Sequence, residues 1–170
     1  RIPIYYQNIS FGEKGSPTEA SNPVSLSDLL AKEDPKAVSD YESARRLKAA
    51  GDLKKAVAML EKLIKKYPSF YIGYIDLGMI LAAQQENDRA LEVFTRANKL
   101  QPEHSWGYIG LGLALNNKQN YQGAAQHLER AVAIEPDSIN AQFQLGLALF
   151  NLGDNDRALS CLQRVVELDP

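Results

Sequence analysis

The sequence predicts an all-α protein, a solenoid of four stacked helix pairs. The first observation is a fixed period, because prolines stand at Pro68, Pro102, Pro136 and Pro170, each 34 residues after the one before. The second is that other residues keep the same period: Leu77-Gly78, Leu111-Gly112 and Leu145-Gly146; Ala56, Ala90, Ala124 and Ala158; and Leu60, Phe94, Leu128 and Leu162. A period of this size is typical of an array whose units bury their apolar faces by stacking.

The residues that recur also resemble a known family. Its pattern is carried by Tyr74, Leu77, Gly78, Ala90, Phe94, Ala97 and Pro102, and again by Tyr108, Leu111, Gly112, Ala124, Leu128, Ala131 and Pro136. This pattern resembles the tetratricopeptide repeat (TPR), over residues 37–170 in copies 37–70, 71–104, 105–138 and 139–170. The resemblance implies a right-handed α-α superhelix that docks other proteins.

Composition narrows the function classes. The chain has 170 residues, 45% of them hydrophobic, and a formal net charge of −2, which does not favour a nucleic-acid or anionic-membrane binder. No apolar run is long enough to span a membrane, and Cys161 has no partner for a disulfide. We therefore expect a cytoplasmic protein, although the chain begins at Arg1, and a segment before it could carry targeting information.

Residues 1–36 are expected to form a mostly irregular arm before the repeat domain. Gly and Pro punctuate residues 1–24, but six apolar residues gather between Ile2 and Phe11. The arm is either a remnant of an upstream element or a strand of chain that lies on a groove, its own or a neighbour's. A short helix is expected near residues 25–32, capped by Ser25 or Ser27.

Capping residues and helix-breaking residues predict where the long helices begin and end. Asp34-Pro35 predicts the start of the first, and Gly51-Asp52 ends it and caps the second. Asn120 and Asp154 occupy the place of Asp52 in later repeats; in repeat two Glu86 stands there, so we expect Asn87 to cap instead. Each helix should run about 14 residues, or ~21 Å. Gly78, Gly112 and Gly146 each cost about 1 kcal/mol against Ala in mid-helix, which predicts a close approach of the paired helix.

Each repeat is expected to contribute one layer of apolar side chains to a continuous core. One layer should contain Tyr74, Leu77, Leu81, Ala90, Phe94 and Ala97, and the next Tyr108, Leu111, Leu115, Ala124, Leu128 and Ala131. No polar helix follows repeat four, although arrays usually carry one. We therefore expect a partner, a second copy or further chain to cover that end.

The family resemblance also places a binding groove. In a TPR array, the first helix of each pair lines the concave side, through set positions of each repeat. Carried onto this sequence, those positions give an apolar groove with amides at one end and basic residues at the other. The proposed contacts are Tyr41, Arg45, Ile72, Ile75, Met79, Trp106, Ile109, Leu113, Asn116, Phe143, Leu147 and Phe150.

The apolar groove has two interpretations. These helices need only one apolar face to hold the array, yet they have two. The second face either fills helix–helix contacts or forms a preformed docking groove for an apolar or amphipathic peptide segment. The carboxylate clamp by which some TPR domains hold chaperone C-termini is not predicted, because Tyr41 and Arg45 replace the Lys and Asn that it needs.

Other functions have little support. The two histidines, His104 and His127, and Cys161 are not arranged in sequence as a catalytic or metal site, so we expect no enzyme, no metal and no cofactor. The main alternative to peptide docking is self-assembly into a homo-oligomer, through the N-terminal arm or the uncapped final repeat. A nucleic-acid site on the lysines of repeat one (Lys54, Lys55, Lys65 and Lys66) is a third, weaker hypothesis.

Overall fold

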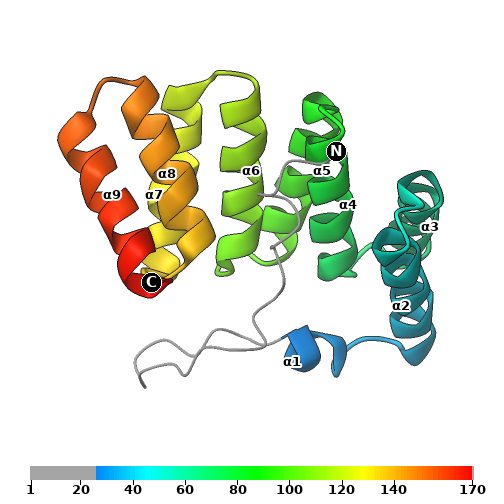
Figure 1. Ribbon diagram of the computed structural model, residues 1–170. Helices are drawn as coiled ribbons and strands as arrows, with labels where there is room; N and C mark the ends of the chain where they lie inside the picture. Colours follow the sequence, from blue (N-terminus) through cyan, green and yellow to red (C-terminus); the bar gives the residue numbers. More distant parts are fainter. Residues whose placement is uncertain (1–25, 170) are drawn as a thin grey trace.

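The chain is an α-solenoid in the computed structural model, which describes residues 26–169 (Figure 1). The described residues hold a one-turn helix and eight long ones. They are α1 (Leu26–Leu30), α2 (Pro35–Ala49), α3 (Leu53–Lys66), α4 (Tyr71–Ala83), α5 (Asn87–Leu100), α6 (Ser105–Asn117), α7 (Tyr121–Ile134), α8 (Ile139–Asn151) and α9 (Asn155–Leu168). The arm expected over residues 1–36 lies outside the described residues up to position 25, and so does the cap at Ser25.

The long helices pair and stack as the period predicts. Helices α2, α4, α6 and α8 form one layer, the inner layer, and α3, α5, α7 and α9 form the outer layer. Each outer helix packs against the inner helix before it and, where one follows in the chain, the inner helix after it. Each long helix has 13 to 15 residues, which confirms the expected length.

The predicted caps are confirmed at four helices. The Asp34 carboxylate accepts hydrogen bonds from two backbone N–H groups at the start of α2, 2.7 Å from Lys36 N. The side chains of Asp52, Asn120 and Asp154 cap α3, α7 and α9 in the same way. Such caps satisfy donors that the first turn of a helix otherwise leaves without partners.

The expected cap at Asn87 is wrong. Helix α5 begins at Asn87, and Glu86 before it makes no side-chain cap. The Asn87 side chain is used elsewhere, because its Oδ1 accepts a hydrogen bond from Asn117 Nδ2 at 3.0 Å. A contact made with a residue 30 positions away has therefore replaced a local one.

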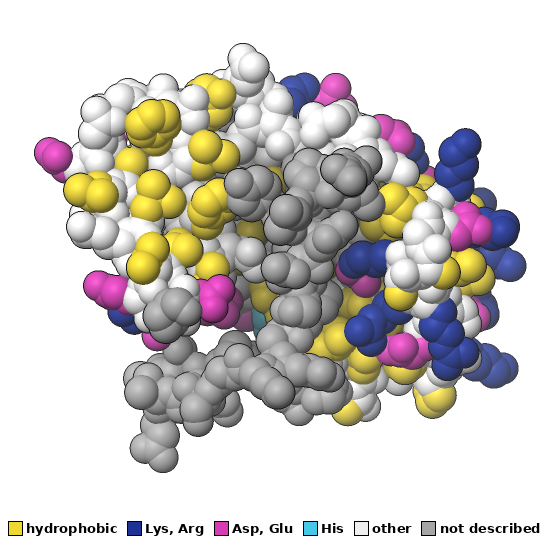
Figure 2. Space-filling model, in the orientation of Figure 1, with side chains coloured by type: hydrophobic (Ala, Val, Ile, Leu, Met, Phe, Trp, Pro, Cys, Tyr) yellow, Lys and Arg dark blue, Asp and Glu magenta, His cyan; other side chains and the backbone are white. Residues whose placement is uncertain are grey.

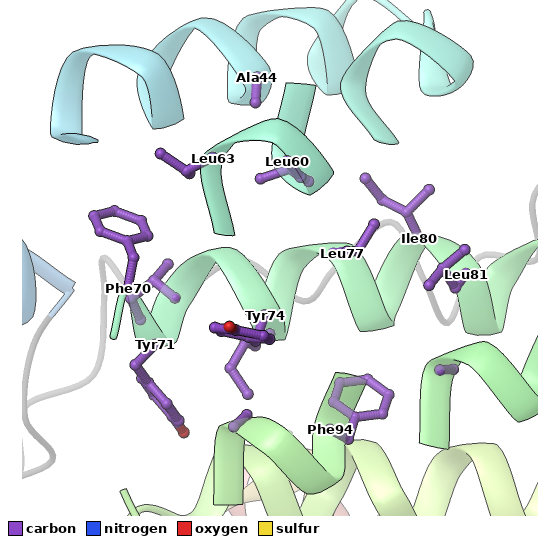
Figure 3. Close-up of a cluster of buried hydrophobic side chains, with 14 of the residues drawn as sticks. Ala44, Leu60, Leu63, Phe70, Tyr71, Tyr74, Leu77, Ile80, Leu81 and Phe94 are labelled. Carbon is purple, nitrogen blue, oxygen red and sulfur yellow. The ribbon is translucent and has the colours of Figure 1, made fainter. Parts of the chain in front are cut away.

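The core confirms the first predicted layer, whose residues all lie in one buried cluster, and divides the second. Leu111 belongs to that first cluster, Leu128 lies in another, and Ala131 lies in a third. Figure 3 shows Leu60 and Leu63 of α3 on one side of α4 and Phe94 of α5 on the other. Because every long helix buries residues against its neighbours, no helix pair needs to be stable alone.

The glycine prediction is also confirmed. A Cβ atom at Gly78 would lie 2.6 Å from the Phe94 ring, and one at Gly146 would lie 3.0 Å from Leu162. Gly112 has the same relation to Leu128. The missing side chains let the outer helix of each pair approach its inner helix, which offsets the lower helix propensity of glycine.

Ion pairs join successive outer helices on the exposed side. Arg89 of α5 reaches back 2.5 Å to Glu61 of α3, and Arg157 of α9 reaches back 2.6 Å to Glu129 of α7. The two pairs have the same spacing of 28 residues. Exposed pairs of this kind contribute about 0–1 kcal/mol each, so they add little to the stability of the array.

Candidate functional site

All the residues proposed for the groove lie on inner-layer helices. Tyr41 and Arg45 are on α2; Ile72, Ile75 and Met79 are on α4; Trp106, Ile109, Leu113 and Asn116 are on α6; and Phe143, Leu147 and Phe150 are on α8. The structure divides this set by burial. Most of the residues on α4 and α6 pack against neighbouring helices, whereas α8 exposes two large apolar side chains.

Tyr41 is a core residue rather than part of a groove wall. Its side chain is completely buried, and its hydroxyl donates a hydrogen bond to Asp76 Oδ2 at 2.8 Å. Burial, reinforced by the Asp76 charge, raises the pKa of the Tyr41 hydroxyl far above its ordinary value. Tyr41 therefore offers no surface to a ligand in this structure, because it holds α2 against α4.

The basic end of the groove is neutralised within the chain. Lys48 Nζ lies 2.8 Å from Asp76 Oδ1, so the same buried carboxylate accepts from both Tyr41 and Lys48. Arg45 pairs with Glu42 at 3.1 Å, and its guanidinium lies over the Tyr41 ring, 5.9 Å from the centroid. Asp76 and Glu42 therefore offset the two positive charges at the end of the groove that was expected to be basic.

The middle of the expected groove is filled by packing. Ile72, Ile75 and Leu113 are buried in the large cluster shared by α2 to α6. Ile109 is buried in a smaller cluster with Ala131 and Ala141. These four side chains support the interpretation in which the second apolar face makes helix–helix contacts.

Met79 and Trp106 lie at the edge of the same cluster. Both are half-buried and pack against it. The Trp106 indole stacks on the Tyr71 ring, with centroids 6.5 Å apart and the planes 13° from parallel. Their remaining exposed area is the part of α4 and α6 that a ligand can reach.

The amides of α6 join inner helices to one another. Asn116 is buried, and its Nδ2 donates to the backbone oxygen and to Oε1 of Gln144, each at 3.0 Å. Asn117 Nδ2 donates at 3.3 Å to the carbonyl oxygen of Ala82. Asn116 was expected at the amide end of the groove, and here its side chain is used to bind α8.

Helix α8 presents the exposed part of the proposed site. Leu147 is 39% exposed and Phe150 63% exposed, while Phe143 is half-buried between them and the helix start. We call these three residues the repeat-four patch. Figure 2 shows apolar side chains gathered over α8 and α9, and Lys and Arg gathered at the opposite end, over α2 and α3. On this face, apolar side chains therefore predominate at one end and Lys and Arg at the other.

Sequence reasoning did not single out the exposed face of α9. Leu159, Leu162 and Val166 lie three and four residues apart, so they share one side of this helix. They are 56%, 36% and 66% exposed, and they line a shallow hollow with Gln163 and Glu167. The sequence did contain evidence of this face. The equivalent positions one period earlier hold Ala125, Leu128 and Val132, which pack between repeats, so apolar residues at the same places in α9 mark a packing surface.

The two histidines and the cysteine lie among other side chains in the described part of the chain. His104 packs on the Tyr71 ring, with centroids 5.6 Å apart, and His127 on Tyr108, and burial lowers the pKa of both imidazoles. Burial raises the pKa of the Cys161 thiol. Within residues 26–169, no group of three His, Cys, Asp or Glu side chains is placed to bind a metal ion. In the same range, no helix has the length and apolar content needed to cross a membrane.

Family models match most of the chain. One model described as tetratricopeptide repeat matches residues 41–105 and 75–139, and a second with the same description matches residues 115–170. Together the matches run from α2 to the end of α9. No curated protein matches the chain.

Solved structures share the fold. MamA from Desulfovibrio magneticus RS-1 (residues 41 to the end) is 24% identical, with a TM-score of 0.70, and the match covers 82% of this chain and 77% of that one. A thermophilic TPR protein of Thermus thermophilus, TTC0263, is 22% identical, with a TM-score of 0.69 and coverage of 85% and 79%. YrrB, described as a TPR protein with an unusual peptide-binding site, is 28% identical, with a TM-score of 0.66 and coverage of 83% and 74%.

Proposed function

This chain belongs to the tetratricopeptide repeat family of protein-interaction modules, and on that premise we propose that it is a non-catalytic docking protein for an apolar or amphipathic peptide segment. The ligand lies along the inner layer, on the accessible parts of the residues that the sequence predicts for the groove. The repeat-four patch is its main contact, with Met79 and Trp106 as further contacts. We place this activity in the cytoplasm.

One observation carries the proposal. Leu147 and Phe150 are large apolar side chains that stay 39% and 63% exposed on an inner-layer helix. Fully burying a Leu or Phe side chain gains about 1.5–3 kcal/mol, and both residues still have a sizeable share of that area to bury. Ordering and association costs take up much of the gain, so we expect an affinity of about micromolar or weaker.

Two further points support peptide binding. Helix α8, which carries the repeat-four patch, has no charged residue, which suits an apolar ligand rather than an acidic one. The printed description of YrrB names a peptide-binding site in a chain with the same fold. Neither point identifies a partner, so the proposal states the ligand by its chemistry alone.

The substitutions that test this proposal must lie at exposed positions. Replacing Ile75 or Ile109 with Asp would place a carboxylate in the core and unfold the chain, since both side chains are buried. Leu147→Asp and Phe150→Asp instead change exposed residues. Gln126→Asp, on the exposed side of α7, is a matched control with the same new charge.

The probe is a phage-displayed library of random peptides, each about 15 residues long and so about as long as one helix of the array, selected on the unmodified chain. We expect the selected peptides to be apolar or amphipathic, to lose binding to Leu147→Asp and to Phe150→Asp, and to keep binding to Gln126→Asp. Circular dichroism checks that all three variants remain helical. Selected peptides that bind the two patch variants as well as the unmodified chain would refute the proposal.

Self-assembly is the second candidate, and the exposed apolar face of α9 favours it. Sedimentation velocity across a concentration series separates the two functions. A monomer at high micromolar concentration counts against a homo-oligomer, and a larger species that dissociates in Val166→Asp counts for one.

A further inference from the structure

The N-terminal arm contains an uncharged, apolar stretch that the proposed function does not use. Residues 2–12 have no charged side chain, and six of them are apolar: Ile2, Ile4, Tyr5, Tyr6, Ile9 and Phe11. A segment that stays in water has no need of so much apolar surface. Residues 2–11 are called the apolar segment below, and they lie outside the described residues.

Charge leaves one layer of the array that suits this segment. The outer helices α3, α5, α7 and α9 each carry both basic and acidic residues. By contrast, α6 and α8 have no charged residue, and α4 has only Asp76, which is buried and accepts hydrogen bonds from Tyr41 and Lys48. The apolar segment can therefore bury its side chains along α4, α6 and α8 without removing an exposed charge from water.

Met79 and Trp106 provide the accessible apolar surface in the middle of the inner layer. Both side chains are half-buried at the edge of the large cluster. Methionine adapts its shape to a neighbour, and the indole offers a wide apolar ring. Since α4 and α6 each have inner helices on both sides, this surface does not depend on how the array ends (Figure 1).

The rest of the arm is long enough to bring the apolar segment to this surface. Leu29 is buried in the large cluster, and Leu26 and Leu30 pack against it, as Met79 and Trp106 do. Helix α1 therefore fixes the arm to the cluster that those two residues border. The residues between Phe11 and Leu26 can extend over about 45–50 Å, whereas neighbouring helices lie only ~8–10 Å apart. The apolar segment itself extends over as much as ~33 Å, enough to cross α4, α6 and α8.

We infer that the apolar segment binds in cis along the inner layer, over Met79 and Trp106, and that an external peptide must displace it. The displacement rests on the function proposed above, because the apolar segment is then an internal ligand of the same docking site. Polarity, reach and the anchoring of α1 all agree with this arrangement.

The tether determines how well the apolar segment competes. A flexible connection of this length holds it at an effective concentration of about 1 mM. With an intrinsic dissociation constant of about 100 μM, it would fill the site in roughly nine molecules out of ten, so an external peptide would bind about tenfold more weakly than to an empty site. Binding in cis also exceeds binding to a second copy while the protein concentration stays below the effective concentration.

The first experiment uses the emission of Trp106, the single tryptophan of the chain. In the whole chain, Ile4→Asp combined with Tyr6→Asp places two charges in the apolar segment and should release it. We expect the Trp106 emission to shift to longer wavelength and iodide to quench it more strongly, because the indole becomes more exposed. Ser16→Asp combined with Thr18→Asp adds the same charges at the same spacing outside the apolar segment and should change neither property.

The second experiment measures the affinity of the peptides selected above. The variant with Asp at positions 4 and 6 should bind them about tenfold more tightly than the unmodified chain does, and the variant with Asp at 16 and 18 should bind them as the unmodified chain does. Circular dichroism checks that both variants keep their helices.

The two experiments separate failure of the internal ligand from failure of peptide docking. Unchanged emission and unchanged affinity would overturn the internal ligand, while peptides that still depend on Leu147 and Phe150 would leave the proposed function standing. Emission of the unmodified chain that shifts on dilution would place the apolar segment on a second copy and also overturn binding in cis. The emission measurement needs no peptide, so it decides where the apolar segment lies even if peptide docking fails.

Discussion

The two glycines that flank the Phe94 ring allow a sharp test of how the repeats fit together. Gly78 and Gly110 lie on successive inner helices, and the ring of Phe94 lies against both of them. A Cβ at Gly78 would be 2.6 Å from the ring, and one at Gly110 would be closer still. The ring therefore cannot move away from one glycine without pressing on the other. We predict that Gly110→Ala destabilises the protein.

Two opposing contributions decide whether Gly110→Ala raises or lowers the free energy of unfolding. Alanine in mid-helix is favoured over glycine by about 1 kcal/mol. Overpacking a well-filled core costs about 1–3 kcal/mol, and a ring held on both sides places Gly110 at the upper end. The net loss should be about 2 kcal/mol, which lowers the melting temperature by roughly 4–8 °C for a chain of this size.

Thermal and urea unfolding, followed by circular dichroism, measure the effect. Gly123→Ala is the control, since the nearest atoms there belong to the exposed Asn120 side chain, 3.0–3.2 Å away. This side chain caps α7 and must shift slightly, so we expect a loss of stability well below that of Gly110→Ala. Phe94→Leu combined with Gly110→Ala should recover part of the loss, because leucine occupies the place of Phe94 in repeats three and four. If Gly110→Ala raised the melting temperature, the close approach of α5 and α6 would not be real.

Three further predictions concern single side chains. Tyr41→Phe should lower the free energy of unfolding by about 1.5–3 kcal/mol, because the buried Asp76 carboxylate loses the hydrogen bond that Tyr41 donates. Urea unfolding measures this change. Burial lowers the pKa values of His104 and His127, so the unfolded chain takes up protons at a higher pH than the folded one. Stability should then fall as pH drops through about 6.5, and changing both residues to Gln should flatten that dependence. Burial raises the pKa of Cys161, so iodoacetamide at neutral pH should modify it more slowly than a free cysteine; an equal rate would contradict the burial.

The sequence predicted those features that depend on residues close together or on the period. The caps at Asp34 and Asp52 follow from local chemistry, and the approach of Phe94 to Gly78 follows from a mid-helix glycine that recurs every 34 residues. These signals lie within one repeat or are repeated in the next. They could therefore be read without knowing how the helices pack.

The features that the sequence could not predict depend on contacts between repeats. Tyr41 occupies a position that lines the groove in the family, but its hydroxyl reaches Asp76, which is 35 residues away. The bond from Asn117 to Asn87 spans 30 residues and removed the expected cap. Periodicity could not decide whether the second apolar face of an inner helix is covered, because Ile109 and Phe143 occupy the same position in adjacent repeats and differ in burial.

The polar contact between the first two repeats has a mechanical consequence. Two bonds from α2, made by Tyr41 and Lys48, converge on one carboxylate of α4. If the molecule were pulled at its two ends, the load would pass through each joint in series. Charged hydrogen bonds act over a shorter distance than a broad apolar contact, so this joint would be stiff up to a small extension and then yield abruptly. The contacts between α4, α6 and α8 are held by hydrogen bonds between neutral groups, made by Asn117 and Asn116. Such bonds are weaker than bonds to a charged group, which would make the array more compliant toward α9.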